Sequence, residues 1–522
     1  MTFGEKLDLI MKIANTTNSA LARAVSIDSS FVSRLRRGLR SPARNENYLK
    51  SMAVYFSGRC NLPYQKAALK ELFEKALNGL PEQKNSPDNT DQLTNLIYQW
   101  FLDEKAIGSK SVENLLHDVT RFNFNKTPQI SEMEISNASD NPVANGTVFY
   151  GIKGKQAAVI NFLSLVLMNK KPVTLLFYSD EDMEWLTESH EFASKWTSLL
   201  IKVIMKGNSI KIIHTVNRSL DEILTSVEKW LPIYMTGAVE PYYYPKTRDG
   251  VFKRTLCIAP DTAVVTSSSV GSNIKNSANF FYTDQETIMA LTEEYNDYLT
   301  LCKPLMRIFT HFRKENYYSV LSEFEDVNSQ SILKTDSLST ITMPVGLAAA
   351  IYSRSCLEND EMERALSYHK TRTERFEDSL QNNKFTEIIT VPDVKAICDE
   401  KIIVNYSQML TGNCIFYTPK EFSAHLKNII RLLQTYDNYN IHLVPCNELE
   451  GMIYAKEDVG VLFGRITQPS VLFATNESNM TSAFWEYMRV ALYKLPNTQS
   501  YRKTAIETLG KIVEAIKGDG GL

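Results

Sequence analysis

Arginine is concentrated in one short segment of this 522-residue chain. Between Ser29 and Asn45 there are five arginines and no acidic residue. A guanidinium group binds phosphate and the edge of guanine, so this composition suits contacts with nucleic acid. The first sixty residues hold ten Lys or Arg against four Asp or Glu, a formal charge of +6, whereas the whole chain carries −3. The positive charge is therefore confined to one end, because the remaining residues carry −9.

The pattern around these arginines predicts two short helices joined by a tight turn. Leu21, Ala22 and Val25 fall on one face of the first helix, and Val32 and Leu35 lie one turn apart on the second. Asp28 or Ser29 is a good N-cap for the second helix, and Gly38 is placed to end it. We therefore expect an N-terminal, all-α helix-turn-helix. The alternative is a small helical interaction domain with a solvated basic face.

Residues 5 to about 60 resemble the lambda-repressor-like (Xre-type) helix-turn-helix of bacterial and phage regulators, through the run SALARAVSIDSSFVSRLRRGLRSP. The resemblance implies that Ser29 to Arg37 form a recognition helix in the major groove of double-stranded DNA. It implies that base edges are read by Ser29, Ser30, Ser33 and Arg34. It implies phosphate contacts from Arg36, Arg37, Arg40 and Arg44.

A second group of residues that could take part in chemistry is HTVNRSLD, His214 to Asp221, at the end of an expected strand. It resembles the phospholipase-D-like family, whose two similar α/β halves each carry His-x-Lys, four residues, then Asp. His214 and Asp221 keep that spacing, but Val216 stands at the lysine position, and valine cannot neutralise phosphate charge. The resemblance thus implies a fold without its catalysis. No nucleotide, zinc-peptidase or serine-hydrolase motif occurs, so we expect no enzyme, no cofactor and no metal site.

An aromatic segment, Trp230 to Arg254, combines six aromatic side chains with prolines, glycines and four cations. Rigid aromatic walls with a few cations are typical of a pocket for an anionic or sugar-like effector. The alternative is an aromatic loop packed on the core or forming a dimer face. The residues expected to bind a small-molecule ligand are His214, Asn217, Arg218, Tyr234, Tyr242, Tyr243 and Arg254.

Shifts in composition along the chain indicate several domains, and the fold class that we expect is an α+α/β multidomain protein. We expect a helix-turn-helix domain over 1–79, a linker with connecting helices over 80–146, and two α/β halves over 147–315 and 316–522. Strands are predicted at 172–178 and 210–216. The order strand, helix, turn, strand over 175–217 recurs over 414–447, which sets Val444 opposite His214 and predicts a duplicated body. The alternative is that any two amphipathic helix-to-strand units look alike.

These patterns lead to one expected function. Seven scattered cysteines lack a CxxC pair, acidic Glu5 and Asp8 lie inside the amphipathic N-terminal run, and no apolar stretch could span a membrane. Together these features predict a cytoplasmic protein that does not enter a membrane. We expect a DNA-binding transcriptional regulator, most simply a repressor, whose body senses an effector and forms a homodimer or higher oligomer on paired half-sites. The alternatives are a DNA-targeted effector enzyme and a switch controlled by a protein partner.

Overall fold

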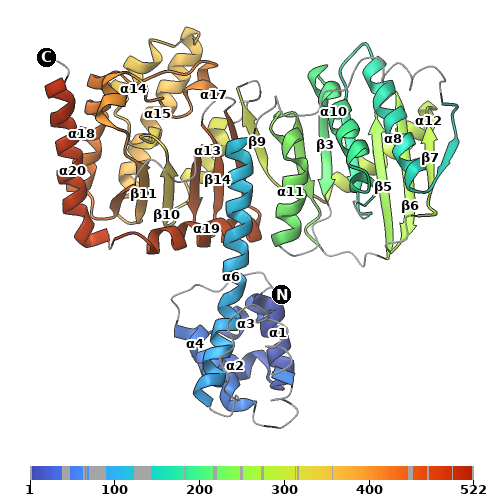
Figure 1. The fold of residues 1–522 in the computed structure, drawn as a ribbon, viewed down its shortest axis with the longest axis horizontal. Coiled ribbons are helices and arrows are strands. Elements are labelled where there is room, and N and C mark those ends of the chain that lie inside the picture. Colours follow the sequence, from blue (N-terminus) through green and yellow to red (C-terminus); the bar gives the residue numbers. More distant parts are fainter. Residues whose placement is uncertain are drawn as a thin grey trace. The chain divides into compact units, whose positions relative to one another are not determined.

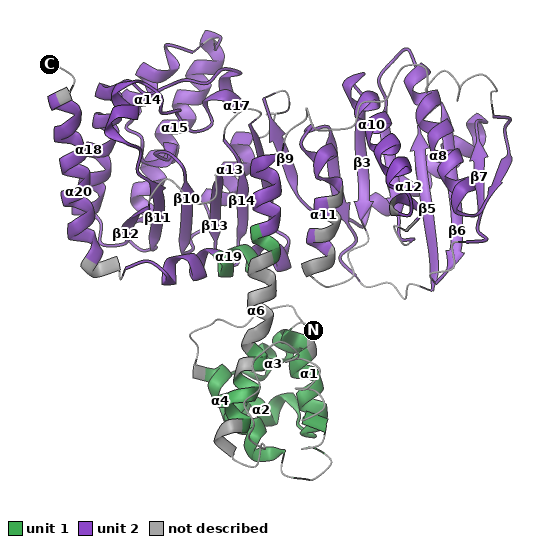
Figure 2. Ribbon diagram, in the orientation of Figure 1, with its two compact units in different colours: residues 1–113, 482–487 green, residues 114–481, 488–522 purple. Residues whose placement is uncertain are grey.

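The computed structural model describes residues 3–37, 47–60, 62, 65, 68–69, 90–122, 143–181, 184–214, 220–246, 251–271, 275–311, 313, 317–355, 357–444, 451–466, 470–496 and 498–519. The chain divides into two compact units, residues 1–113 with 482–487, and residues 114–481 with 488–522 (Figure 2). Among the described residues, no helix is both long and apolar enough to cross a membrane.

The first unit is helical. Its described helices are α1 (Phe3–Ile13), α2 (Asn18–Val25), α3 (Ser29–Arg36), α4 (Asn47–Arg59) and the part of α6 (Thr90–Arg121) up to Glu113. Every one of these helices supplies apolar side chains to a single core, which removes them from water and stabilises the unit. The core includes Leu7, Ile10, Leu21, Val25, Val32, Leu35, Leu49, Phe56, Trp100 and Phe101.

The second unit begins with a half built on an eight-stranded sheet (Figure 1). Its elements are β1 (Thr147–Tyr150), α8 (Gly151–Met168), β2 (Thr174–Ser179), α9 (Glu184–Thr187), α10 (His190–Met205), β3 (Ser209–His214), α11 (Leu220–Tyr234), β4 (Val239–Tyr243), β5 (Phe252–Ala259), β6 (Ala263–Val270), β7 (Ala278–Tyr282), α12 (Gln285–Thr300) and β8 (Lys303–Pro304).

A second half follows, built on a seven-stranded sheet. Its elements are β9 (Arg307–Thr310), α13 (Tyr317–Glu325), β10 (Ser331–Thr335), the 3-10 turn η2 (Thr340–Thr342), α14 (Val345–Tyr352), α15 (Asn359–Ser379), β11 (Phe385–Thr390), α16 (Val394–Cys398), α17 (Ser407–Thr411), α18 (Pro419–Thr435), β12 (Tyr439–Val444), β13 (Met452–Lys456), β14 (Gly460–Arg465), β15 (Val471–Thr475), α19 (Ser478–Tyr493) and α20 (Thr498–Asp519).

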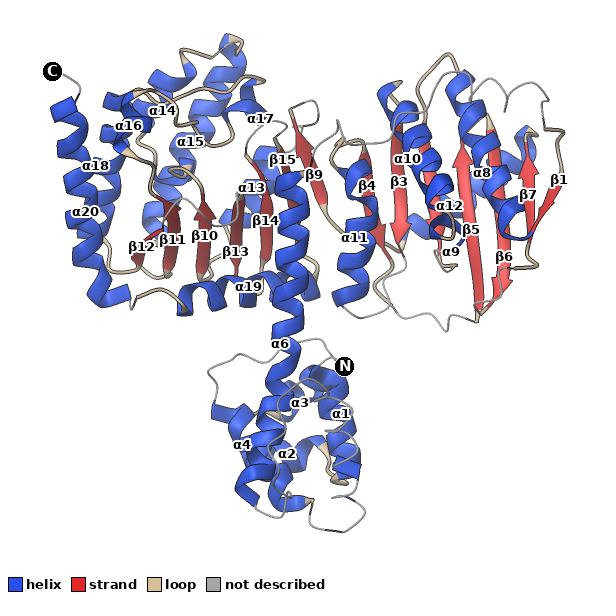
Figure 3. Ribbon diagram, in the orientation of Figure 1, coloured by secondary structure: helices blue, strands red, loops and turns tan. Residues whose placement is uncertain are grey.

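The two sheets repeat one topology over the described strands (Figure 3). The first runs β4-β3-β2-β5-β6-β7-β1, with β8 added beside β4, and the second runs β12-β11-β10-β13-β14-β15-β9. In each sheet the first three strands are parallel and the others are antiparallel. The fold is therefore a helical unit followed by a body with two multistranded α/β sheets.

Two aspartates mark equivalent positions in the halves. Asp180, just after β2, accepts a hydrogen bond from the backbone N–H of Arg254, and Asp336, just after β10, accepts one from the backbone N–H of Gly451. The hairpins that follow turn through Asp261 and Asp458, both in the left-handed region with φ of 60° and 57°. Aspartate tolerates this conformation better than most residues, so both tight turns use it for the same reason.

These equivalences correct the predicted alignment of the repeat. Tyr178 pairs with Ile213 and Leu256, as Lys334 pairs with Ile388 and Ile453, so β3 matches β11 and β4 matches β12. Counted from there, the residue equivalent to His214 is Ile389, so the predicted match with Val444 is wrong by one strand. The second sheet includes a strand that precedes residue 315, because β9 pairs with β15.

Alternate residues of a strand face opposite layers of helices, as the two-residue period requires. Phe177 packs against Phe162 of α8 and Trp230 of α11, while its neighbour Tyr178 packs against Tyr298 of α12 on the other face. In the second half, α13, α15 and α18 share one face of the sheet with Leu333, Phe385 and Tyr454. The halves are joined by Leu305, whose N–H donates to Pro241 O and whose carbonyl accepts from Thr475 Oγ1.

Each half encloses a different set of buried polar groups. In the first, the ammonium of Lys155 contacts the carboxylate of Glu181, which also accepts from Thr255 and Ser267. In the second, the carboxyl of Glu387 on β11 is fully buried and accepts hydrogen bonds from Ser339 and Tyr439. Burial raises the pKa of Glu387 to about 7, against the opposing effect of these hydrogen bonds.

The raised pKa of Glu387 predicts a pH-dependent stability. Between about pH 4.5 and pH 7 the folded protein holds a proton that the unfolded chain has released, so the free energy of unfolding falls as the pH rises. A shift of this size corresponds to roughly 3 kcal/mol. Urea unfolding should therefore show that Glu387→Gln gains stability relative to wild type between pH 5 and pH 8.

The matched control for this measurement is Glu377→Gln. Its ion pair with Arg431 lowers the pKa of Glu377, so this carboxyl is charged in the folded and the unfolded protein over most of this range. The difference in free energy of unfolding between Glu377→Gln and wild type should therefore stay nearly constant with pH. Parallel pH profiles for wild type and Glu387→Gln would show that Glu387 keeps its charge when buried.

Candidate nucleic-acid interface

The start of α3 is set by local hydrogen bonds. Ser26 ends α2 in the left-handed region, and Asp28 then caps α3, its carboxylate accepting from the backbone N–H groups of Ser30 at 2.7 Å and Phe31 at 3.3 Å. The Ser30 side chain and these backbone bonds lower the pKa of Asp28, since hydrogen bonds favour the charged carboxylate. The predicted cap was Asp28 or Ser29, and the structure uses Asp28.

One face of α3 is fixed in the core of its unit. Val32 and Leu35 are fully buried there, and the ring of Phe31 meets Tyr48 of α4 edge-on with ring centroids 5.6 Å apart. This packing leaves the helix little freedom to rotate. The residues on its other face therefore have a defined direction.

The opposite face of α3 carries only hydroxyl and guanidinium groups. Ser29, Ser30, Arg34 and Arg37 are exposed and Ser33 is half-buried. Arg34 Nη2 donates to Ser30 Oγ at 3.4 Å, and Arg37 Nη2 donates to Ser33 Oγ at 2.9 Å. Solvent-exposed hydrogen bonds of this kind contribute little, so both guanidinium groups can turn to another acceptor at small cost.

Arg36 differs from the other arginines of α3. It is half-buried, and its guanidinium donates to Asp8 of α1, with Nε 3.1 Å from Oδ1, and to Asn18 Oδ1 of α2 at 2.8 Å. Hydrogen bonds from Lys12 and Arg36 lower the pKa of Asp8. The guanidinium of Arg36 thus connects three helices of the unit, a role that the expected phosphate contact did not include. Arg40 and Arg44 lie outside the described residues.

The predicted ligand group is not assembled into a pocket. His214 is only 8% exposed, Tyr234 is fully buried, and the two are hydrogen-bonded through His214 Nε2 and the Tyr234 hydroxyl, beside the ring of Trp230. Burial lowers the pKa of His214 to about 4, so the imidazole is neutral at ordinary pH. The hydrogen bond between them satisfies both groups within the core.

The other predicted ligand residues are dispersed. Tyr242 donates to Glu240 Oε2 at 2.9 Å, and Tyr243 pairs with His214 across β3 and β4. Arg254 lies on β5, separated from β3 by β2, and forms an ion pair with Glu294 of α12. Asn217 and Arg218 lie outside the described residues. The expected aromatic pocket is therefore not found among the described residues.

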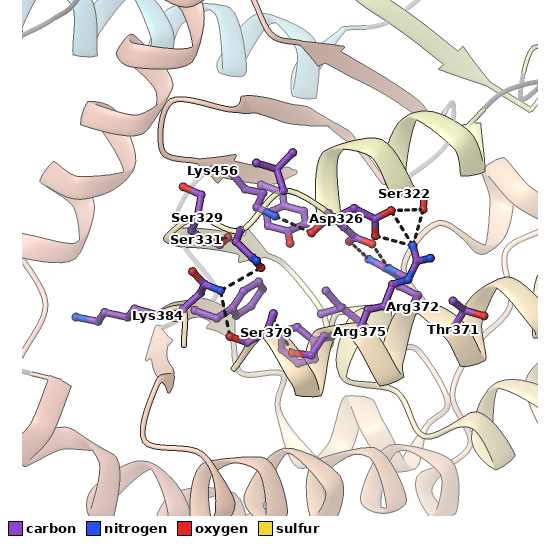
Figure 4. Close-up of a pocket in the computed structure, with 18 of the residues that line it drawn as sticks. Ser322, Asp326, Ser329, Ser331, Thr371, Arg372, Arg375, Ser379, Lys384 and Lys456 are labelled. Carbon is purple, nitrogen blue, oxygen red and sulfur yellow. Dashed lines mark hydrogen bonds and ion pairs between the residues drawn. The ribbon is translucent and has the colours of Figure 1, made fainter. Parts of the chain in front are cut away.

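A cavity does occur in the second half, where no ligand site was predicted (Figure 4). Cationic and hydroxyl side chains line it, among them Ser322, Ser331, Arg372, Arg375 and Lys456. Arg372 and Arg375, three residues apart on α15, are a weak signal in the sequence, because their partners come from distant segments. Within the described part of the chain, no three His, Cys, Asp or Glu side chains are placed to hold a metal ion.

No protein-family model matches the chain, and no curated protein sequence matches it. Solved structures that resemble parts of it include TrmBL2, described as an archaeal chromatin protein with a novel mode of DNA binding (14% identity, 54% of this chain and 98% of that chain, TM-score 0.24). They also include the polyphosphate kinase of Porphyromonas gingivalis (10%, 76% and 60%, TM-score 0.24) and the yeast tyrosyl-DNA phosphodiesterase (9%, 60% and 84%, TM-score 0.14). Similarity at this level identifies neither a family nor a function.

Proposed function

We propose that the first unit binds double-stranded DNA through the exposed face of α3. The observation that carries the proposal is the composition of this face: serine hydroxyls and two arginines, on a helix whose other face is fixed in the core. Asp28, the acidic residue beside it, is already engaged as the N-cap. Such a face offers hydrogen-bond donors to base edges and to phosphates without an opposing negative charge.

The arginines then have separate roles. Arg34 lies on the outward face beside Ser30 and Ser33 and is suited to the O6 and N7 atoms of guanine. Arg37, at the end of the helix, is suited to phosphate, as Arg40 and Arg44 are by their place in the sequence. Arg36 acts as a positioning residue, because it fixes α3 to α1 and α2. The positive charge of the first sixty residues supports this division.

We further propose that the chain is a transcriptional regulator, most simply a cytoplasmic repressor, whose α/β body senses an effector and holds two or more copies together. A single small helical module contacts too little DNA to be selective, so paired half-sites would supply the specificity. A switch driven by a protein partner uses the same surface for DNA and differs only in what the body binds.

Catalysis at His214 is the competing proposal, and we infer that it does not occur. The imidazole is buried and bonded to Tyr234, and the equivalent position in the second half is Ile389. Phosphodiester cleavage by two facing histidines needs a nucleophile and an acid that both reach the substrate. The described residues supply neither at these two positions.

Replacing Arg34 tests the DNA interface. Preferred sites would first be selected from a random duplex library with the wild-type protein, and affinity then measured on preferred and scrambled DNA. Arg34→Ala should weaken binding to preferred DNA by about 1–3 kcal/mol and relax the choice of one base. Arg59→Ala, which removes an exposed arginine of α4, is the charge-matched control and should leave that choice unchanged. Equal losses of affinity and of base preference in Arg34→Ala and Arg59→Ala would show that α3 is not part of the DNA interface.

Replacing Arg36 tests its positioning role. Arg36→Gln breaks the contacts among α1, α2 and α3 and should cost roughly 1–2 kcal/mol of local stability, since charged hydrogen bonds at a half-exposed site are partly screened by water. Amide hydrogen exchange over residues 3–37 should accelerate in this variant and in Asp8→Asn, but not in Arg37→Gln. Unchanged protection in Arg36→Gln would return Arg36 to the phosphate-binding set.

Purified wild-type protein should show no turnover of generic phosphodiesters or nucleic acids. His214→Ala and His117→Ala, which removes an exposed histidine of α6, serve as comparison variants. Turnover that is present in wild type and His117→Ala but absent in His214→Ala would establish the enzyme. Turnover equal in all three preparations would identify a contaminant.

A further inference from the structure

The cavity in the second half lies at the amino-terminal ends of β10 and β11 (Figure 4). Helices α13 and α15 and the end of β13 complete its walls. The space that it offers to solvent is about 50 Å³. One water needs roughly 10–15 Å³ by this kind of measure, so the cavity has room for a group of several non-hydrogen atoms.

Lys456, in the wall of this cavity, is a buried cation. The residue is 4% exposed, its Nζ donates to Glu325 O at 2.9 Å, and it lies over the Phe324 ring at 5.5 Å. It forms no ion pair with any carboxylate in the part of the chain that the structure describes. An ammonium has three N–H donors, so the backbone contact leaves donors open. Burial lowers the pKa of Lys456 to about 8, which still leaves it mostly charged near neutral pH.

Two arginines of α15 approach the same space. Arg372 binds Glu325 through two donors at 2.7 Å, with both side chains 11% exposed, so this pair is a fixed part of the wall. Arg375 forms an ion pair with Asp326 and donates a hydrogen bond to Ser322. This ion pair lies at the surface, because the side chain of Arg375 is 55% exposed and that of Asp326 is 45% exposed. Surface ion pairs contribute about 0–1 kcal/mol, so Arg375 can exchange Asp326 for a stronger acceptor. With Lys384, the lining carries four cations against two carboxylates.

A hydroxyl group adds a further donor. The oxygen of Tyr368 is buried in the wall and has no hydrogen-bond partner among the described residues. A buried hydroxyl without a partner is costly, and a bound acceptor would remove that cost. Tyr368 and Arg375 lie seven residues apart on α15, and Lys456 lies at the end of β13, so their donors come from two elements of the wall. A tetrahedral oxyanion presents acceptors in several directions, whereas a carboxylate presents two in one plane.

We propose that this cavity binds a small tetrahedral oxyanion, namely inorganic phosphate or the phosphate group of a small metabolite whose remainder stays outside. Lys456 and Arg375 supply the charge, and Tyr368 supplies an additional hydrogen bond. The site is independent of the proposed DNA contact, because it involves neither α3 nor the arginines around it. A protein that fails to bind DNA can still bind the anion, and the reverse also holds.

Calorimetric titration of the full-length protein tests the site. Inorganic phosphate and glycerol 3-phosphate are the probes, with sodium chloride of equal ionic strength and acetate as reference anions. Saturable binding of at least one phosphate probe is expected, with acetate bound at least tenfold more weakly. Lys456→Met and Arg375→Gln should each weaken the probe by roughly tenfold or more, as loss of a charge-assisted contact does. Arg431→Gln, which breaks the surface ion pair with Glu377 outside the cavity, should bind as wild type does.

The outcomes separate clearly. Binding of phosphate itself identifies free phosphate as a sufficient ligand, and binding of glycerol 3-phosphate alone identifies a phosphorylated metabolite. Heats no larger than those of chloride, or equal affinities in wild type, Lys456→Met and Arg375→Gln, would overturn the proposal. If Lys456→Met does not fold, Arg375→Gln and Tyr368→Phe decide the matter, because neither removes an apolar core contact.

Discussion

The position where each sheet changes from parallel to antiparallel pairing determines the rest of the body. At that position β2 lies between β3 and β5, and β10 lies between β11 and β13. The carboxylate of Asp180 accepts from the backbone N–H of Arg254 in β5, and that of Asp336 accepts from the N–H of Gly451, just before β13. Since a slip of one residue would turn every side chain of a strand to the other face, this contact also decides which residues reach the helices.

The halves share this framework but differ in their buried polar groups. The first contains the ion pair of Lys155 and Glu181, and the second contains Glu387 with two hydroxyl partners. Buried polar groups are tolerated only where their particular partners are present, so neither set can be satisfied in the other half. We infer that these groups help each set of strands to pair within its own half. The common topology has thus been kept while the interior chemistry has diverged.

Local signals in the sequence predicted the local structure well. The two helices around Ile27 were expected from capping residues and apolar spacing, and strands expected at 172–178 and 210–216 occur at Thr174–Ser179 and Ser209–His214. The order of helices and strands in a mixed α/β body was also predictable. Each of these features depends on residues within a few positions of one another.

Features that depend on distant residues were not predictable. Arg36 looks like its neighbours in sequence, but its partner Asp8 lies 28 residues away, and this contact changes its role. The repeat was detected but misaligned, because amphipathic helix-strand units are interchangeable until cross-strand pairing distinguishes them. The sequence did not predict the cavity, because its walls come from segments as far apart as Ser322 and Lys456. Tertiary contacts alone bring those residues together.

The opposed faces of α3 also have an evolutionary consequence. Asp28 caps the helix, Val32 and Leu35 lie in the core and Arg36 contacts α1 and α2, whereas Ser33, Arg34 and Arg37 form exposed or half-exposed hydrogen bonds along the helix itself. Surface substitutions usually change stability by less than about 0.5 kcal/mol, so the outward face of α3 can vary one residue at a time while the domain stays folded.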